Sequence, residues 1–148
     1  IQGFIECDRP MNSGHSHYVY NVALDAMNRW IVDGTLPPSG NLLSVTDELT
    51  AFVLDEFGNA EGGIRTPYVD APAAILSGLG QTGESFCGLF GTTSLFSAAE
   101  MASIYIDEAG YVQAVTDAAD SAMEAGFLLP EDAALIIAWA PEQWRSAP

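Results

Sequence analysis

The sequence predicts an α/β chain that is too small to complete a fold of that class on its own. Apolar residues recur at three- and four-residue intervals over residues 16–33, which predicts an amphipathic helix. Extended runs and turn residues over 42–65 predict a β-hairpin, and strong helix signals follow from residue 97. A doubly wound sheet requires several strand–helix–strand units, whereas this chain shows at most one strand-to-helix step before the hairpin.

The N-terminal part begins with an apolar stretch and continues into the first helix. Residues 1–5 predict a short strand or buried entry segment, and the Asp, Pro, Asn, Ser and Gly residues of 8–14 predict a loop. In the helix that follows, Val22 lies on an apolar side and Asp25 on a polar side. Gly34 suits the position directly after the last helical residue, so we expect the helix to end there.

A small β-element occupies the middle of the chain. Residues 42–45 and 49–54 predict extended segments, and the tetrapeptide EFGN at 56–59 predicts a turn that leads into 62–65. Residues 73–76 then predict a brief apolar strand, which a glycine-rich surface loop follows.

The C-terminal part predicts a helical tail. Ser97 and Glu100 have the spacing of a capping box, so we expect a helix over 97–105. A longer helix over 107–125 has acidic residues at its start and a glycine after its end. Proline followed by two acidic residues then predicts a last helix over 130–140.

The charge balance excludes several classes of partner. The chain has twenty acidic residues and four basic ones, all arginine, and its net charge is −16. Such a surface repels phosphate backbones and anionic lipids, so we expect neither a nucleic acid nor a membrane as partner. Acidic residues are spread singly and 49% of the chain is hydrophobic, which favours a folded domain over disorder. No apolar run has the length of a membrane span, and we expect a soluble protein.

The segment GGIRTPYVDAP at residues 62–72 is specified in unusual detail. It combines two glycines and two prolines with the pair Arg65 and Asp70. The pair is a candidate carboxylate clamp for a substrate, although a structural ion pair that pins the loop is the favoured interpretation. Tyr68 between them is a candidate pocket wall or a core residue.

Four segments, taken in order, carry a resemblance to a known family. They are HYVYNVALDAMNRWIVDG at 17–34, GGIRTPYVDAP at 62–72, CGLFGTT at 87–93 and AGFLLPEDA at 125–133. They resemble the C-terminal part of large bacterial proteins that carry an alpha/beta hydrolase domain. The resemblance covers nearly the whole chain, yet it is to the back half of a longer protein.

The resemblance implies a layout for the chain. As the C-terminal portion of an alpha/beta-hydrolase-like fold, residues 1–36 would supply the last strand, loop and helix of the sheet region. Residues 37–93 would form the hairpin and loops, and 94–148 the helical tail. The chain begins with Ile1 and an apolar run rather than a start methionine, so we expect a piece of a larger hydrolase domain.

The resemblance also implies a function, that of a serine-nucleophile ester or acyl hydrolase without a cofactor. That fold needs a nucleophile elbow, usually G-x-S-x-G, and the chain has none. We therefore expect a non-catalytic portion that contributes scaffold and one wall of the active site. Its partners would be the missing N-terminal part of the same hydrolase and a small-molecule ester. The alternatives are an interaction module that docks through the helical tail, and a small hydrolase that uses His17 with Ser13.

His15 and His17 lie in the loop before the first helix, about where the fold places its catalytic base. His17 matches the family's motif position better, whereas His15 stands where proline is usual. A capping or surface role is the favoured interpretation, and the resemblance implies that the catalytic histidine lies upstream of Ile1. A zinc site from the two histidines with Asp8 or Glu6 is the weakest alternative.

Cys7 and Cys87 are too far apart for a C-x-x-C metal or redox motif. Buried free thiols, a structural disulfide and a reactive nucleophile all remain open, the last disfavoured because no basic cluster adjoins either cysteine. The resemblance implies the disulfide, since both cysteines lie in family-like segments and such proteins often look secreted. A secreted or periplasmic location is the corresponding expectation.

Overall fold

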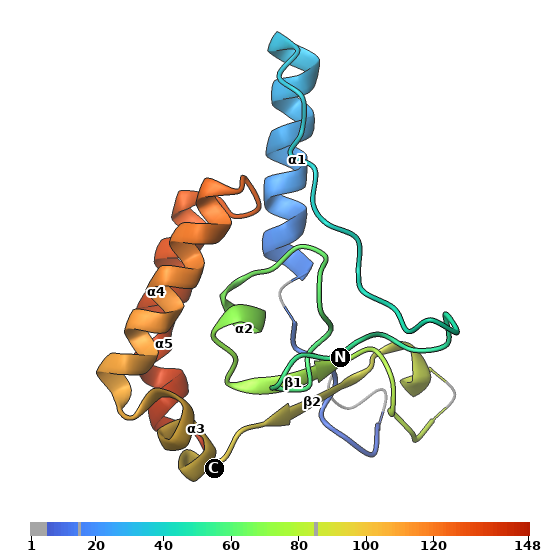
Figure 1. The fold of residues 1–148 in the computed structure, drawn as a ribbon, viewed down its shortest axis with the longest axis vertical. Coiled ribbons are helices and arrows are strands. Elements are labelled where there is room, and N and C mark those ends of the chain that lie inside the picture. The colour runs from blue at the N-terminus through green and yellow to red at the C-terminus, as the bar shows by residue number, and fades with distance from the viewer. Residues whose placement is uncertain (1–5, 15, 85) are drawn as a thin grey trace.

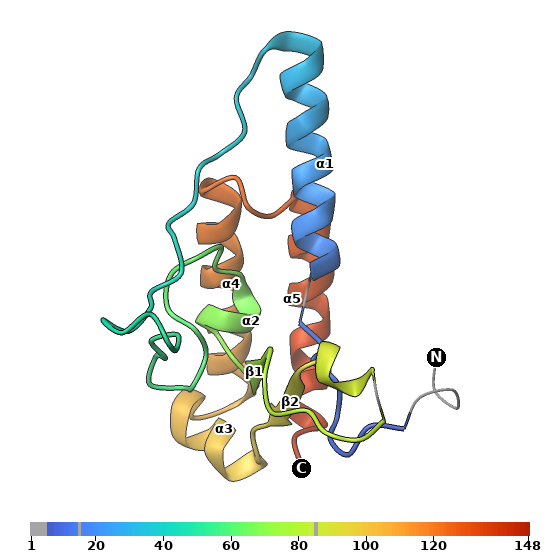
Figure 2. The same cartoon turned by 90° about the vertical axis from the view of Figure 1, so that its right-hand side faces the viewer.

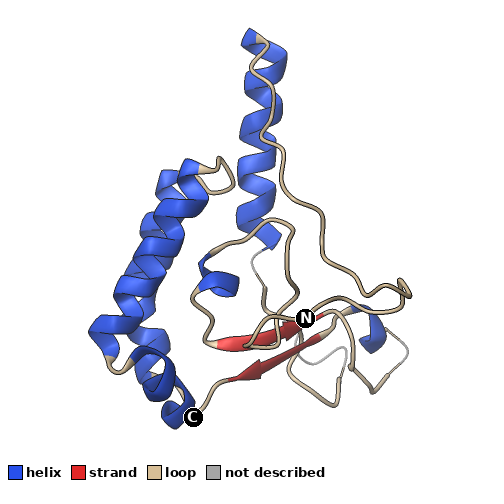
Figure 3. Cartoon of the chain, in the orientation of Figure 1, coloured by secondary structure: helices blue, strands red, loops and turns tan. Residues whose placement is uncertain are grey.

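The computed structural model describes residues 6–14, 16–84 and 86–148, so the strand expected at 1–5 lies outside the described residues. The elements in order are α1 (Ser16–Asp33), α2 (Pro67–Asp70), β1 (Ala74–Ser77), the 3₁₀ helix η1 (Cys87–Leu89), β2 (Thr92–Leu95), α3 (Ala98–Tyr105), α4 (Glu108–Glu124) and α5 (Pro130–Arg145). Figure 1 shows the long α1 at the top, α3 to α5 at the left, and the short sheet below α1. Helices and loops dominate over strands (Figure 3).

Helix α1 has the bounds that the sequence predicts. Val22 and Ala26 are its buried residues. Gly34 adopts a φ of 80° and its amide donates to the carbonyl oxygen of Trp30 at 3.1 Å, which ends the helix as expected. In both views the far end of α1 extends beyond the other elements (Figures 1 and 2).

The predicted hairpin after α1 is present only as isolated bridges. Val45 pairs with Phe52, Leu54 with Ala60 and Leu43 with Gly62, all antiparallel. Gly62 has a φ of 79°, and a Cβ at this position would lie 2.2 Å from the carbonyl oxygen of Leu42. The close approach of these two backbones therefore requires glycine at position 62.

The regular sheet is formed instead by β1 and β2, which pair antiparallel with Ala74 opposite Leu95 and Ser77 opposite Thr92. Strand β1 is shifted by one residue from the predicted 73–76. Strand β2 was not predicted, because its two threonines resemble capping residues. Thr93 is buried, and its hydroxyl donates to the carbonyl oxygen of Met11 at 2.9 Å.

Most of the predictions for the helical tail are confirmed. The Ser97 hydroxyl accepts from the Glu100 amide, and the Glu100 carboxylate accepts from the Ser97 amide, which completes the capping box. Asp107 caps α4 through one bond, since its carboxylate accepts from the Gly110 amide at 2.8 Å. The prediction that the last helix ends at residue 140 is wrong, because α5 continues through Pro141 to Arg145. Proline forfeits one helical hydrogen bond, but the packing of α5 against α4 outweighs that loss.

The hydrophobic core lies among α2 to α5 rather than around the sheet. Its fully buried side chains include Met101, Tyr111 and Val115. The Tyr111 hydroxyl lies 3.2 Å from Oε1 of Gln143 and so links α4 to α5. Tyr18 at the start of α1 is partly buried and packs against this core. No helix in the described part of the chain is both long and apolar enough to cross a membrane.

Candidate functional site

An open depression of about 470 Å³ lies between the start of α1, helix α2 and the loops beside the sheet. We call it the α1–β1 depression. Its apolar lining residues are Val19, Ile64, Val69, Leu76, Leu89 and Phe90. Asn12, Ser16 and Thr66 add polar groups without charge. Of the described residues that line it, none carries a formal charge, in a chain whose net charge is −16.

The loop before α1 is held against the sheet by the side chain of Asn12. Its amide nitrogen donates to the carbonyl oxygen of Ser77 at 3.0 Å, and its oxygen accepts from the amide of Gly14 at 2.7 Å. The backbone amide of Asn12 donates to the carbonyl oxygen of Phe90 at 3.0 Å. These bonds fix one wall of the α1–β1 depression to the end of β1 and to the segment before β2.

Arg65 lies at the centre of a polar cluster beside the depression. Its guanidinium group bonds Asp70 through Nε and Asp55 through Nη2 at 3.2 Å. It also donates to the carbonyl oxygens of Ala60 at 3.3 Å and Val69 at 3.4 Å. Four of its five N–H groups can be used in this way, which ties together residues 55–70. This geometry is that of a structural ion pair, and a role in substrate binding stays a prediction.

The electrostatics of the cluster agree with its geometry. Partial burial lowers the pKa of Arg65, but the hydrogen bonds to Asp70 and Asp55 more than offset this, and the pKa lies above its ordinary value. The Asp55 carboxylate in turn accepts from the amides of Phe57 and Asn59, each at 3.0 Å. The turn that leads toward α2 is therefore organised around one arginine and two carboxylates.

Tyr68 is directed toward the helical core. It lines a gap of about 10 Å³ together with Ala71, Tyr111 and Ile136. Burial, reinforced by the neighbouring Tyr18, raises the pKa of Tyr68 from 10.0 to about 12. Of the two roles predicted for Tyr68, these contacts are those of a core residue, and its role in substrate binding stays a prediction.

His17 is exposed at the first turn of α1. Ser16 and Val19 line the α1–β1 depression, whereas His17 is not among the lining residues. The imidazole contacts the ring of Tyr18, with centroids 3.8 Å apart, and forms no hydrogen bond or ion pair with another described side chain. The catalytic role of His17 stays a prediction.

The proposed zinc site depends on residues that the structure describes only in part. His15 lies outside the described residues. Among the residues that are described, no three His, Cys, Asp or Glu side chains are grouped so that they could hold a metal ion.

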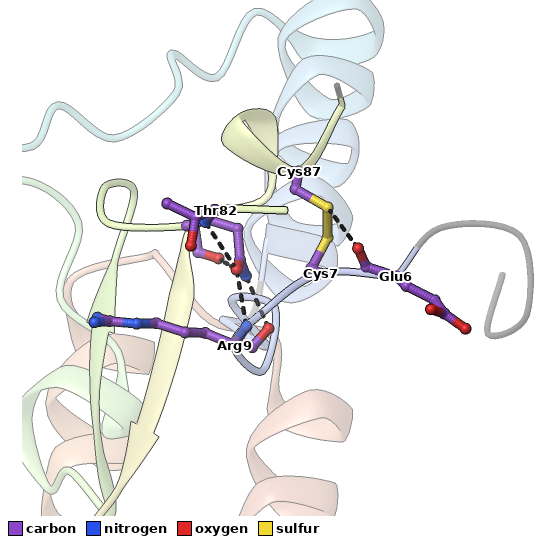
Figure 4. The surroundings of a disulfide bond; sticks show 7 residues. Glu6, Cys7, Arg9, Thr82 and Cys87 are labelled. Carbon is purple, nitrogen blue, oxygen red and sulfur yellow. Dashed lines mark hydrogen bonds between the residues drawn. A yellow bond between two sulfur atoms is a disulfide. The ribbon is translucent and has the colours of Figure 1, made fainter. Parts of the chain in front are cut away.

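Cys7 and Cys87 form a disulfide, with their Cα atoms 5.5 Å apart (Figure 4). Cys87 is fully buried at the start of η1. The amide of Asp8 donates to the carbonyl oxygen of Thr82 at 3.0 Å, so a backbone bond reinforces the covalent one. The side chain of Gln81 adds hydrogen bonds to both backbone groups of Arg9 at 3.1 and 2.9 Å. The loop before α1 is thereby attached to the segment between β1 and β2.

Sequence reasoning missed the α1–β1 depression because its lining comes from four separate segments. The available signals were the turn residues around Asn12 and the glycines at 78 and 91, which predict loops that approach one another closely. Nothing in the sequence indicates that these loops meet beside Val19. The predicted site residues Arg65 and Asp70 lie next to lining residues in the chain, without lining the depression themselves.

Comparison with known proteins identifies a family for this chain. A family model described as Alpha/beta hydrolase domain matches residues 2–138, which is most of the chain. The match supports a hydrolase-like scaffold. Neither the curated proteins nor the solved structures contain a match.

Proposed function

Because the chain belongs to the alpha/beta hydrolase domain family, we propose that it is the non-catalytic portion of a serine-nucleophile ester or acyl hydrolase. In this role it contributes scaffold and one wall of the active site. The nucleophile, the oxyanion hole and the catalytic histidine lie in the N-terminal part of the same hydrolase, and the substrate is a small-molecule ester. Neither a nucleic acid nor a membrane takes part.

The exposed apolar surface of α1 carries this proposal. Its residues Tyr20, Leu24, Met27 and Ile31 are 68%, 59%, 48% and 73% exposed. Their spacing of four, three and four places them on one face of the helix. A contiguous exposed apolar face of this kind is unusual in a protein that acts alone, because water contact with it is unfavourable. The rest of a hydrolase fold would cover it.

A second exposed apolar segment lies beyond α1. Its large apolar residues are Leu36, Leu42, Leu43, Leu49, Phe52 and Leu54, each at least 46% exposed. All but Leu36 lie in the bridged segment that includes the pairs Val45–Phe52 and Leu54–Ala60, and their side chains are largely exposed. Among the described residues the sheet has two strands, so it has no further strand that could cover these side chains. Additional strands and helices from the N-terminal part would complete the sheet and bury both surfaces.

The catalytic groups present in the chain also favour a non-catalytic portion. The chain contains no G-x-S-x-G elbow. The hydroxyl of Ser13, the alternative nucleophile, lies 3.2 Å from the Thr93 hydroxyl rather than beside an imidazole. Activation of a serine requires a base within hydrogen-bond reach, and Ser13 has no such partner among the described side chains.

The proposal is tested by joining this chain with the N-terminal part of the same hydrolase and measuring ester hydrolysis. Leu24→Glu places a charge on the exposed apolar face of α1, whereas Ala99→Glu places the same charge at an exposed position of α3, away from that face. Both should leave the free energy of unfolding of the isolated chain within about 0.5 kcal/mol. We expect Leu24→Glu to abolish complementation and Ala99→Glu to preserve it. Equal activity of the two variants would contradict the proposal.

An interaction module is the second candidate, and a specific observation on α5 favours it. Leu135 and Trp139, one helical turn apart, are 61% and 57% exposed on the outer side of the helical tail. This pair is an anchor of the type found at protein interfaces. If Trp139→Ala, and not Leu24→Glu, prevents assembly with the N-terminal part, the helical tail is the docking element.

A further inference from the structure

We propose that the α1–β1 depression is a binding pocket for a neutral, largely apolar group with the size of a short acyl chain or a single ring. Its assignment as the acyl-side wall of an active site rests on the proposed function. The binding itself does not, because it concerns only residues of this chain. With about 470 Å³, the depression has the size of known small-molecule sites.

The lining of the depression selects against charge. Val19, Leu76 and Phe90 present apolar surface from three segments of the chain. The described polar residues of the lining are uncharged and offer no ion pair to a bound carboxylate. Desolvation of an unpaired charge is costly, and the net charge of −16 adds repulsion of anions. An uncharged ester or amide group with an apolar chain meets neither penalty.

The walls of the depression are fixed before any ligand binds. Asn12 attaches one wall to Ser77 and Phe90, as described above. Gln81 donates to the carbonyl oxygen of Gly91 at 2.9 Å in a buried position, which holds the opposite wall. Gly91 has a φ of 57°, and a Cβ there would lie 2.2 Å from the carbonyl oxygen of Ser77. A pocket with fixed walls loses little entropy when it binds, which favours small ligands.

Gly78 gives direct experimental access to the pocket. It lines the depression, and a Cβ built on it meets no atom within 4 Å. Gly78→Leu therefore adds a large apolar side chain at the wall of the depression without a clash at the new Cβ. Gly88 is the matched control, since its Cβ also meets no atom within 4 Å and it does not line the depression. Both glycines have backbone conformations open to ordinary residues.

The test is a titration of the ¹⁵N-labelled chain with hexanamide and with hexanoate, which differ in charge at equal chain length. We use about 1 M salt, where the Debye length is about 3 Å and long-range repulsion is suppressed. Hexanamide should give saturable shifts at the amides of Val19, Leu89 and Gly91. Hexanoate should bind at least about tenfold more weakly. Equal affinity for the two ligands, or shifts confined to the apolar face of α1, would overturn the proposal.

The two glycine variants make the test specific. Gly78→Leu should weaken hexanamide binding at least about tenfold, and Gly88→Leu should change it by no more than about twofold. Equal loss in both variants would also overturn the proposal. Saturable binding at the depression without ester hydrolysis by the joined protein would contradict the proposed function alone. Hydrolysis by the joined protein without binding at the depression would contradict the pocket alone.

Discussion

Loss of the Cys7–Cys87 disulfide should cost the protein a large part of its stability. The bond joins residues separated by 80 positions in the chain. The chain-entropy model gives about 4.5 kcal/mol at 25 °C for the closure of a loop of this length in the unfolded state. Measured effects are typically about 2–4 kcal/mol. For a chain of 148 residues this corresponds to a fall in Tm of roughly 4–16 °C.

Cys7→Ala is the cleaner of the two single substitutions. Cys87 is fully buried, so Cys87→Ala would add the cost of a cavity to the loss of the bond. Cys7 is only half-buried, and the backbone bond from Asp8 to Thr82 survives its replacement. Thermal unfolding followed by circular dichroism measures the effect, with and without a reducing agent.

We expect the reducing agent to lower the Tm of the natural chain to that of Cys7→Ala, and to leave the variant unchanged. The variant and the oxidised natural chain should therefore differ only in the bond. A difference in Tm below about 1 °C would refute the reasoning, since it would mean that the bond does not constrain the unfolded chain.

Three further predictions concern the polar cluster, the helix cap and the buried tyrosine. Arg65→Met leaves two carboxylates without their cation and should lower the free energy of unfolding by about 1–3 kcal/mol in urea titrations, whereas Arg29→Met, at an exposed pair, should cost about 0.5 kcal/mol or less. Ser97→Ala removes the cap of α3 and should cost about 1 kcal/mol by the same measurement. Because the pKa of Tyr68 is raised from 10.0 to about 12, its stabilising contribution is complete below pH 10.0 and is lost as the pH rises toward about 12. Tyr68→Phe should flatten the loss of stability over this range, and an unchanged pH profile would contradict the assignment.

The elements that the sequence predicted well are those with local signals. Helix α1 ends as expected because Gly34 supplies the left-handed conformation that stops it. The start of α3 follows from Ser97 and Glu100, whose reciprocal hydrogen bonds need only three residues of spacing. Local chemistry decides such boundaries, so they can be predicted from the sequence alone.

The elements that the sequence did not predict depend on distant contacts. Helix α5 passes through Pro141 because its packing against α4 compensates a lost hydrogen bond, and no local signal reports that compensation. Strand β2 depends on Thr93, whose hydroxyl bonds the loop before α1, 82 residues away in the chain. The α1–β1 depression forms where four segments of the chain come together, so it too depends on distant contacts.

Activity of the isolated chain tests the central claim most directly. The measurement is turnover of short p-nitrophenyl esters by the purified chain, together with a serine-reactive phosphonate probe and mass spectrometry. A non-catalytic portion predicts no turnover above buffer and no adduct, from a sample that unfolds cooperatively. A labelled serine accompanied by turnover would contradict the account, because it would place a complete active site within these 148 residues.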